Sequence, residues 1–400
     1  MSRITIVYRK NILCFVLVMA VCCAFFCVGC KNKTTDTTKK SIASGNIKWD
    51  ELKKTGEMEL KYADMFSVDY YGDYSLVTIA DSEKYLLIPK KGEVPANLDE
   101  DIVPIKLPLK NSYVASSASM DLFREIGALS NVKMTGTKIE DWSIDEIKEY
   151  IDSGKILYGG KYSAPDYEMI LENNCDVAIE STMIFHTPKV KEELENIGIP
   201  VMVERLSYEK EPLGRVEWIK LFGLMSGRLS EAEKFMEECS KRYEDVVSKV
   251  SEKNKENKKK KVAFFYISSN GYVNVRKPGD YISKMIDIAG GSYAFSDYVP
   301  DEENALSTMN LQMEAFYEGA YDADYIIYNS TIDGEISTVD ELIGKCEVLK
   351  DFKAIKNGNA WCTGKNMFQE TTGTIGMIED LFEVINENNS DELKYLHRLK

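Results

Sequence analysis

The sequence predicts an α/β protein: a two-lobed clamp in which each lobe is a parallel-sheet α/β sandwich and one long backbone helix joins the lobes. Three observations predict this fold. The chain has 400 residues, which is too many for one ordinary core, so two lobes are expected. Strand patterns and helix patterns alternate in both halves, as in parallel sheets. A single long helical pattern interrupts this alternation near the middle.

The composition restricts the classes of function. Hydrophobic residues make up 44% of the chain and charged residues 29%, which is ordinary for a soluble globular body. The formal net charge is −15 at pH 7. A protein that binds phosphate backbones needs a basic face, so no nucleic acid partner is expected.

The N-terminus has the features of an export signal. Basic residues near the start precede an unbroken apolar run from Ile12 to Gly29, and a polar stretch follows. Val28-Gly29-Cys30 resembles the bacterial lipobox, in which Cys30 becomes the acylated first residue of the mature protein. The run is also just long enough to be an uncleaved helical anchor. Both interpretations place the body outside the cytoplasm, and we predict a membrane lipoprotein that is held in the lipid bilayer through Cys30.

The composition and the pattern of apolar residues change along the chain and predict five parts. They are, in order, a signal peptide (1–29), a tether (30–54), an N-terminal α/β lobe with a leading strand meander (55–216), an inter-lobe backbone helix (217–260) and a C-terminal α/β lobe (261–400).

The first lobe shows the alternation most clearly after its meander. Glycines end two of the helical patterns, as left-handed residues commonly do. The expected strands are Tyr113–Ala115, Lys155–Tyr158, Val177–Ile179 and Ile199–Val203. The expected helices are Ser119–Ile126, Tyr167–Glu172 and Pro188–Ile197.

The alternation stops at Glu217. From there to about Val250 the chain has no proline, and its apolar residues follow a helical stripe that is interrupted near Gly227. The stripe ends in a lysine run, which we interpret as a solvated helix end. Alternation then resumes, with strands at Val262–Ile267, Tyr325–Tyr328 and Ala360–Thr363. Helices are expected at Tyr281–Ala289, Leu311–Tyr321 and Thr374–Asn388.

Several stretches between Tyr113 and Glu383 carry a family resemblance. They are Tyr158–Glu168, Cys175–Ile179, Pro188–Pro200, Pro212–Gly223, Gly290-Gly291 and Asp324–Tyr328. Together they resemble the periplasmic-binding-protein family that serves the ABC importers of iron siderophores, haem and cobalamin. The resemblance implies two α/β lobes around a ligand cleft, with one rigid helix between them.

The resemblance also implies an ABC transporter permease as a partner. In the family, one glutamate on each lobe docks onto arginines of the transmembrane permease, and Glu168 and Glu314 stand at the matching positions. The spacing from the glutamate to the aspartate that opens the next strand is two residues longer for Glu314 than for Glu168. Glu168 has a second interpretation, because a carboxylate in the first turn of a helix compensates the helix dipole by about 0.3–1 kcal/mol.

The scarcity of histidine limits the metal chemistry. His186 and His397 are the only two histidines, whereas a bare zinc or manganese ion is usually bound by several imidazole and carboxylate ligands. We therefore predict no protein-held metal and no cofactor, and only His186 is placed for an axial contact with haem. The four cysteines of the body have no CxxC spacing and are expected to be buried thiols.

Aromatic residues and arginines near the strand ends are the candidate ligand contacts. Aromatic faces suit a flat or bulky ligand, and arginines suit its anionic groups. Each candidate also has a plain interpretation as a core or solvated residue. The predicted ligand-binding residues are Trp142, Tyr162, Met183, His186, Arg205, Tyr208, Tyr272, Arg276, Tyr298 and Trp361.

These contacts favour an iron chelate of the siderophore type, whose own oxygens satisfy the metal. Cobalamin and haem remain alternatives for the same clamp. We predict that the protein is not an enzyme, because the chain has no GxSxG, HExxH or P-loop motif. An extracytoplasmic enzyme with paired carboxylates, or a surface adhesin or sensor, stays open as another class.

Overall fold

The computed structural model describes residues 47–253, 258–299, 307–386 and 393–400. The predicted signal peptide, Cys30 and most of the tether lie outside the described residues. Within the described part of the chain, no helix is both long enough and apolar enough to cross a membrane.

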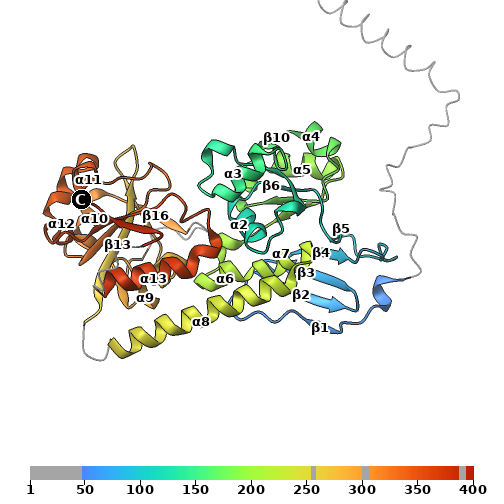
Figure 1. The fold of residues 1–400 in the computed structure, drawn as a ribbon, viewed down its shortest axis with the longest axis horizontal. Coiled ribbons are helices and arrows are strands. Elements are labelled where there is room, and N and C mark those ends of the chain that lie inside the picture. Colours follow the sequence, from blue (N-terminus) through green and yellow to red (C-terminus); the bar gives the residue numbers. More distant parts are fainter. Residues whose placement is uncertain (1–46, 254–257, 300–306, 387–392) are drawn as a thin grey trace, which may run out of the picture. The chain divides into compact units, whose positions relative to one another are not determined.

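The described chain opens with a short 3-10 helix, η1 (Trp49–Glu51), and a five-stranded sheet, which is the predicted meander (Figure 1). The first four strands pair as antiparallel neighbours, and the fifth pairs with the fourth in parallel. Phe66 and Val68 are buried while Ser67 between them is exposed, so one face packs on the body. The strands are β1 (Gly56–Glu57), β2 (Phe66–Tyr71), β3 (Tyr74–Ile79), β4 (Glu83–Ile88) and β5 (Ile102–Lys106).

The first α/β lobe contains the predicted parallel sheet. Its strand order is β12-β11-β6-β7-β8, and every neighbouring pair is parallel. The strands are β6 (Ser112–Val114), β7 (Val132–Thr135), β8 (Leu157–Tyr158), β11 (Ala178–Glu180) and β12 (Val201–Val203). The helices are α2 (Ser117–Glu125), α3 (Asp145–Asp152), α4 (Tyr167–Glu172) and α5 (Pro188–Asn196). Sequence patterns missed β7 and α3.

Short elements complete this lobe and occupy many of its loops. A small hairpin precedes α4, and 3-10 turns follow several of the strands. They are η2 (Leu129–Asn131), η3 (Ile139–Asp141), β9 (Gly160–Lys161), β10 (Ala164–Pro165), η4 (Thr182–His186) and η5 (Leu206–Tyr208).

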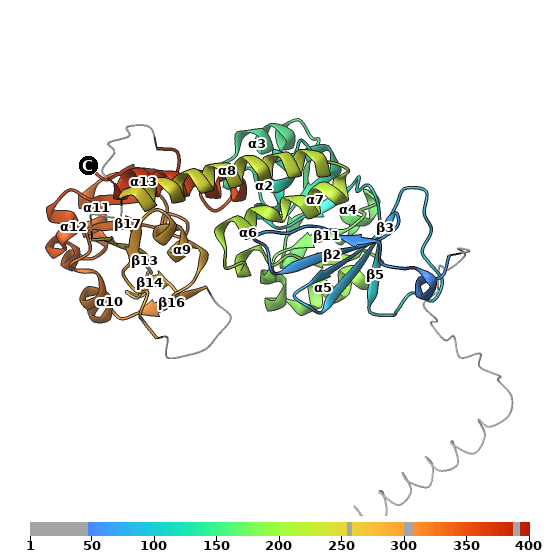
Figure 2. The same cartoon turned by 90° about the horizontal axis from the view of Figure 1, so that it is seen from below.

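The predicted single backbone helix consists of separate helices, α6 (Pro212–Glu217), α7 (Ile219–Ser226) and α8 (Leu229–Lys253). The break falls at Gly227, whose φ of 75° is a left-handed conformation that glycine adopts without strain. The chain then turns back, so α7 and α8 pack together; a Cβ on Gly223 would lie 2.8 Å from the Cβ of Ala232. The far end of helix α8 packs against helix α13 of the second lobe (Figure 2).

The second lobe has a mixed sheet with a parallel centre. Strand β13 (Lys260–Ile267) pairs in parallel with β15 (Gly291–Tyr293) and β17 (Tyr325–Tyr328), and β17 pairs in parallel with β18 (Ala360–Thr363). Antiparallel strands extend both margins of this sheet. These marginal strands, which the sequence patterns did not reveal, are β14 (Val273–Arg276), β16 (Thr308–Leu311) and β19 (Leu396–Arg398).

Helices flank this second sheet, and one of them packs on the backbone helix. Arg242 of α8 donates to Glu379 of α13 at 2.8 Å. The helices of this lobe are α9 (Tyr281–Ile288), α10 (Met313–Ala320), α11 (Val339–Lys345), η6 (Glu347–Asp351), α12 (Lys353–Lys356), η7 (Thr371–Gly373) and α13 (Thr374–Ile385).

One large apolar core links the N-terminal sheet, helices α6 to α8 and the second lobe. The rings of Phe66 on β2 and Trp218 between α6 and α7 lie 4.7 Å apart within it. A separate core that includes Tyr113, Ile170 and Leu194 fills the space between the first parallel sheet and its outer helices.

Candidate functional site

Two adjoining cavities lie between the lobes. The larger has a volume of about 900 Å³ and the smaller about 290 Å³, and Ser117 and Phe368 line both. Residues that follow strand ends form their walls: Ser181 and Glu204 come directly after β11 and β12, and Gly364 follows β18. The carboxyl ends of parallel strands are where open α/β sheets bind ligands.

An arginine–tyrosine stack forms one wall of the smaller cavity. The guanidinium groups of Arg215 and Arg276 lie 4.0 and 5.1 Å from the ring centre of Tyr281. Arg276 forms two hydrogen bonds of 2.7 Å with Asp280, so its charge is compensated. Arg215 donates to the carbonyl of Leu206 at 2.9 Å and makes no ion pair with a described residue. Among the described residues, Arg215 is therefore a cation that a backbone carbonyl orients and that no carboxylate pairs with.

Glu204 faces the same cavity from the end of β12. Its carboxylate accepts hydrogen bonds from the Ser116 hydroxyl at 3.0 Å and the Leu206 amide at 2.6 Å. Burial raises the pKa of Glu204 above its usual value, because the charged form loses its hydration. The positive charges of Arg215 and Arg205 act in the opposite direction and lower this pKa.

The larger cavity contains side chains of both signs beside aromatic ones. Lys148 pairs with Asp145 and Lys394 pairs with Glu370, both at 2.8 Å. Lys365 makes no ion pair within the described ranges. The cavity also contains Glu140, Asp141, Trp142, Glu335, Phe368 and His397.

The described residues hold no group of three or more His, Cys, Asp or Glu side chains that could bind a metal ion. The side chains of Arg215 and Lys365 suit the negatively charged groups of a ligand.

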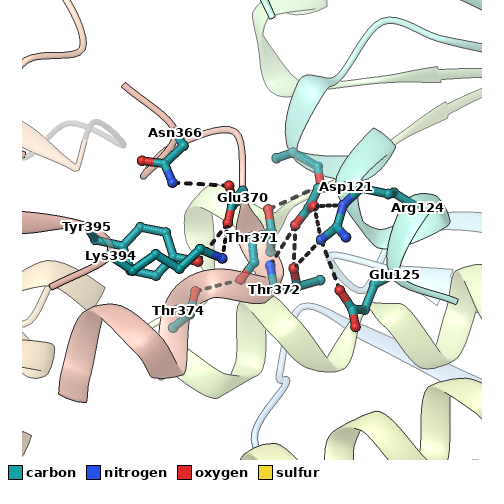
Figure 3. A network of polar contacts seen from close by, with 11 residues as sticks. Asp121, Arg124, Glu125, Asn366, Glu370, Thr371, Thr372, Thr374, Lys394 and Tyr395 are labelled. Carbon is teal, nitrogen blue, oxygen red and sulfur yellow. Dashed lines mark hydrogen bonds and ion pairs between the residues drawn. The ribbon is translucent and has the colours of Figure 1, made fainter. Parts of the chain in front are cut away.

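The segment Gly364–Gly373, which we call the bridging segment, connects the second lobe to the first (Figure 3). The Thr372 amide and hydroxyl both donate to Asp121 of α2 at 2.8 Å. The side chain of Gln369 accepts from the Ser143 amide and donates to the Asp141 carbonyl, both at 2.7 Å. Since the bridging segment also lines the larger cavity, ligand contacts and inter-lobe contacts share the same short stretch of chain.

Two of the predicted ligand residues line these cavities: Trp142 in the larger and Arg276 in the smaller. The indole N–H of Trp142 donates to the Thr137 carbonyl at 3.3 Å, which fixes the ring. The others line neither cavity. They are Tyr162, Met183, His186, Arg205, Tyr208, Tyr272, Tyr298 and Trp361.

Two of these residues have other contacts. Arg205 pairs with Glu83 of the N-terminal sheet at 2.8 Å and lies 4.7 Å from the ring centre of Phe185. Trp361 is buried in β18 beneath Arg398, which lies 4.9 Å from its ring centre. Sequence position next to a strand end therefore did not determine which side chains face the cavities.

Sequence reasoning missed Glu204, Arg215, Lys365, Phe368 and His397. Arg215 left a weak signal in the sequence, as a cation among apolar residues that is soon followed by Glu217 and Lys220. His397 left none, since strand β19 brings it to the larger cavity from the end of the chain.

The two predicted docking glutamates occupy equivalent places. Glu168 is the second residue of α4, and Glu314 is the second residue of α10; both are exposed. Helix α4 precedes β11 and helix α10 precedes β17, so both helices begin at the carboxyl edges of their sheets. The two glutamates therefore occupy equivalent positions although their spacings to the next strand differ by two residues.

Comparisons with known proteins agree with this architecture. A model of the periplasmic binding protein family matches residues 114–366. An uncharacterized lipoprotein of Methanocaldococcus jannaschii is 30% identical over 383 residues and covers 90% of this chain and 87% of its own length. A second from the same organism is 26% identical over 407 residues and covers 98% of this chain and all of its own.

Solved structures of binding proteins share the fold. A periplasmic haem-binding protein of Vibrio cholerae matches with a TM-score of 0.55 and 17% identity, over 68% of this chain and 98% of that chain. A molybdate-binding protein of Haemophilus influenzae matches with a TM-score of 0.56 and 9% identity, over 71% and 88%. The family model covers more than half of the chain and a 30% identical relative covers nine tenths of it, so this chain belongs to the periplasmic binding protein family.

Proposed function

We propose that this protein is a lipid-anchored binding protein that captures an anionic iron chelate of the siderophore type and delivers it to the permease of an ABC importer. The observation that carries the ligand class is a pair of cations in the two inter-lobe cavities, Arg215 and Lys365, which form no ion pair with the residues that the structure describes. The formal charge of the chain is −15, so an anion has to be attracted locally, and these two cations supply that attraction.

The size and chemistry of the larger cavity support a bulky ligand. Its volume of about 900 Å³ falls in the range of about 300–1,000 Å³ that small-molecule sites occupy. Trp142 and Phe368 offer apolar faces, while Ser330 and Thr331 offer hydroxyls. Membership of a periplasmic family and similarity to proteins named lipoproteins support a body outside the cytoplasm.

A calorimetric and thermal-shift panel tests the ligand. The purified body, residues 47–400, would be titrated with ferric siderophores, cobalamin, haemin, molybdate and zinc. A ligand at 100 times its Kd should stabilise the protein by about 2.7 kcal/mol. Lys365→Gln should weaken binding of the anionic chelate, whereas Lys148→Gln, whose lysine is already paired, should weaken it less. Binding of cobalamin, haemin or molybdate alone would reassign the ligand.

The proposed anchor is tested by Cys30→Ser. Stable membrane attachment needs more than one acyl chain, which lipoprotein modification supplies. The substitution should release the body from the membrane fraction or block signal processing. Unchanged processing and unchanged fractionation would favour an uncleaved helical anchor.

The proposed docking is tested by reversing the charge of both glutamates. Glu168→Lys with Glu314→Lys should abolish uptake and leave ligand affinity of the isolated protein unchanged. Glu172 and Glu318 lie on the same two helices and are also exposed, so Glu172→Lys with Glu318→Lys is a matched control. Equal loss of uptake in both pairs would refute a specific role for Glu168 and Glu314.

A further inference from the structure

A further cavity, of about 490 Å³, lies at the edge of the second sheet where its parallel strands begin. Strand pairing places it there, because Lys261 of β13 lies opposite Ser292 of β15, and Asp324 directly precedes β17. The two inter-lobe cavities lie at the opposite edge, where residues that follow the strands line them. Glu314 begins its helix at that opposite edge as well. This cavity is therefore separate from the proposed ligand site and from the proposed docking site.

Lysines dominate the lining of this cavity, which we call the basic pocket. Four consecutive lysines lead into β13, and a fifth begins α12. Together with three aspartates they are the charged lining residues: Lys258, Lys259, Lys260, Lys261, Lys353, Asp297, Asp322 and Asp324. Five lysines against three aspartates leave an excess of two positive charges, although the whole chain has a formal charge of −15.

Two of the three aspartates are already paired with lysines of the basic pocket. Lys261 Nζ lies 2.6 Å from Asp322, and Lys353 donates to Asp324 at 2.7 Å. Asp324 also accepts a hydrogen bond of 2.8 Å from the Lys261 amide. These carboxylates therefore fix two of the lysines in place and leave little negative charge to oppose an incoming anion.

The outer lysines of the basic pocket are available to a partner. Lys258 and Lys259 are exposed, and neither forms an ion pair with the residues that the structure describes. The remaining aspartate, Asp297, is exposed too and has no lysine partner within the same ranges. The basic pocket thus presents more unpaired positive than negative charge to the outside.

The kind of anion follows from the type of these cations. A lysine ammonium is a hydrated point charge on a flexible stem, whereas the planar fork of arginine recognises one carboxylate or phosphate in a fixed geometry. None of the described lining residues of the basic pocket is an arginine. The lining therefore suits a surface on which many phosphates can move, rather than one ligand held in a single orientation.

We propose that the basic pocket binds the headgroups of anionic phospholipids and holds the undocked protein against the bilayer through its second lobe. The inference rests on the proposed membrane anchor, which keeps the chain beside a bilayer. A basic patch and a lipid anchor reinforce each other at a membrane surface. Because the basic pocket and Glu314 lie at opposite edges of one sheet, contact with lipid and docking on the permease would be successive states of the protein.

Lysine labelling of the reconstituted full-length protein tests the inference. The vesicles consist of phosphatidylcholine with or without about 30% phosphatidylglycerol, which supplies the anionic surface. An amine-reactive reagent should label Lys258 and Lys259 about 5-fold more slowly on the anionic vesicles, since a lysine near such a surface contributes about 1 kcal/mol. Roughly 0.5 M salt should abolish the difference, because it screens the charges. Equal rates on both kinds of vesicle would overturn the inference.

A second pair of lysines provides the matched control. Lys90 and Lys91 are also consecutive and exposed, but they lie outside the basic pocket. Lys258→Gln with Lys259→Gln should remove the protection of Lys353, which is 49% exposed in the same pocket. Lys90→Gln with Lys91→Gln should leave that protection unchanged. Protection of Lys353 that survives the first pair of substitutions contradicts the proposal.

The same vesicles distinguish lipid from a soluble ligand and the inference from the anchor. If glycerol 1-phosphate protects the lysines on neutral vesicles as well as phosphatidylglycerol does, the pocket takes a free phosphate ester and the assignment to lipid is wrong. If the protein stays with both kinds of vesicle but its lysines are labelled equally, the inference fails and the proposed anchor stands. If the protein stays with neither, both fail.

Discussion

Two polar contacts that join parts of the described chain differ in what surrounds them. At the first, which we call the N-terminal seam, the loop before β2 lies on α6. Glu217 accepts hydrogen bonds from the amides of Lys61, Tyr62 and Ala63 at 3.0, 2.7 and 2.9 Å. Glu209 accepts from Trp218 Nε1 at 2.7 Å and from the amides of Asp64 and Met65 at 3.0 and 3.2 Å.

At the second, which we call the lobe seam, Asp121 of α2 is the central carboxylate. It accepts from Thr372 and pairs with Arg124 at 2.7 Å, and the Arg124 guanidinium also donates to the Thr372 hydroxyl at 3.1 Å (Figure 3). The lobe seam consists of this cluster and the contacts of Gln369, and the two cavities lie beside it. The N-terminal seam, by contrast, adjoins the large apolar core. Cavity-lining residues and inter-lobe contacts therefore lie side by side at the lobe seam, whereas the carboxylates of the N-terminal seam line neither cavity.

The largest effect is expected at the N-terminal seam. Glu217→Ala should lower the free energy of unfolding by about 3 kcal/mol, because three partly buried backbone amides lose their acceptor. Glu217→Gln should cost less, since the amide oxygen still accepts. Urea unfolding measures both. A cost for Glu217→Ala below about 1 kcal/mol would show that apolar packing alone holds the sheet.

A smaller effect is expected at the lobe seam. Asp121→Ala should cost about 2–3 kcal/mol, because the Thr372 amide and Arg124 lose a buried acceptor. Amide hydrogen exchange should accelerate at Thr372 and stay slow at Tyr62 and Ala63. Faster exchange at all three amides would mean that the two seams open as one unit, which would break the comparison.

Glu180 can be compared with the carboxylates of both seams. It is also buried, but its oxygens receive no hydrogen bond from the described residues. Burial raises its pKa from 4.5 to about 8. The folded state thus keeps a proton that the unfolded state loses above pH 4.5, so the free energy of unfolding falls between pH 4.5 and 8.

Glu180→Gln should remove that part of the pH dependence. At pH 8.5 the variant should be more stable than the wild type by about 1–3 kcal/mol, and near pH 4 the two should be similar. Urea unfolding at several pH values measures this. A parallel pH profile in variant and wild type would mean that water or another group satisfies Glu180.

The smallest effect is expected at the exposed ion pair of Arg242 and Glu379, whose side chains are 46% and 37% exposed. Arg242→Gln should cost about 0.5 kcal/mol or less, and the difference should shrink in high salt. If Arg242→Gln costs as much stability as Asp121→Ala, the contact between α8 and α13 matters as much as the lobe seam for holding the second lobe. That result would contradict the comparison.

The sequence by itself determined the elements whose signals are local. The α/β class, the break at Gly227, helix α4 and strands β17 and β18 follow from short-range patterns of apolar residues, glycines and caps. Motifs within Tyr158–Glu168 and Pro188–Pro200 were enough to indicate the family. Those features depend on residues that are close in sequence, so the sequence alone can reveal them.

The tertiary structure alone decided which side chains meet. Asp121 and Thr372 are 251 positions apart, and His397 reaches Glu335 only because β19 pairs with β18. Strand-end position brought Trp142 and Arg276 to the cavities but left Arg205 paired with Glu83 on the N-terminal sheet. The direction of a side chain at a strand end depends on long-range packing, and the local sequence does not encode that packing.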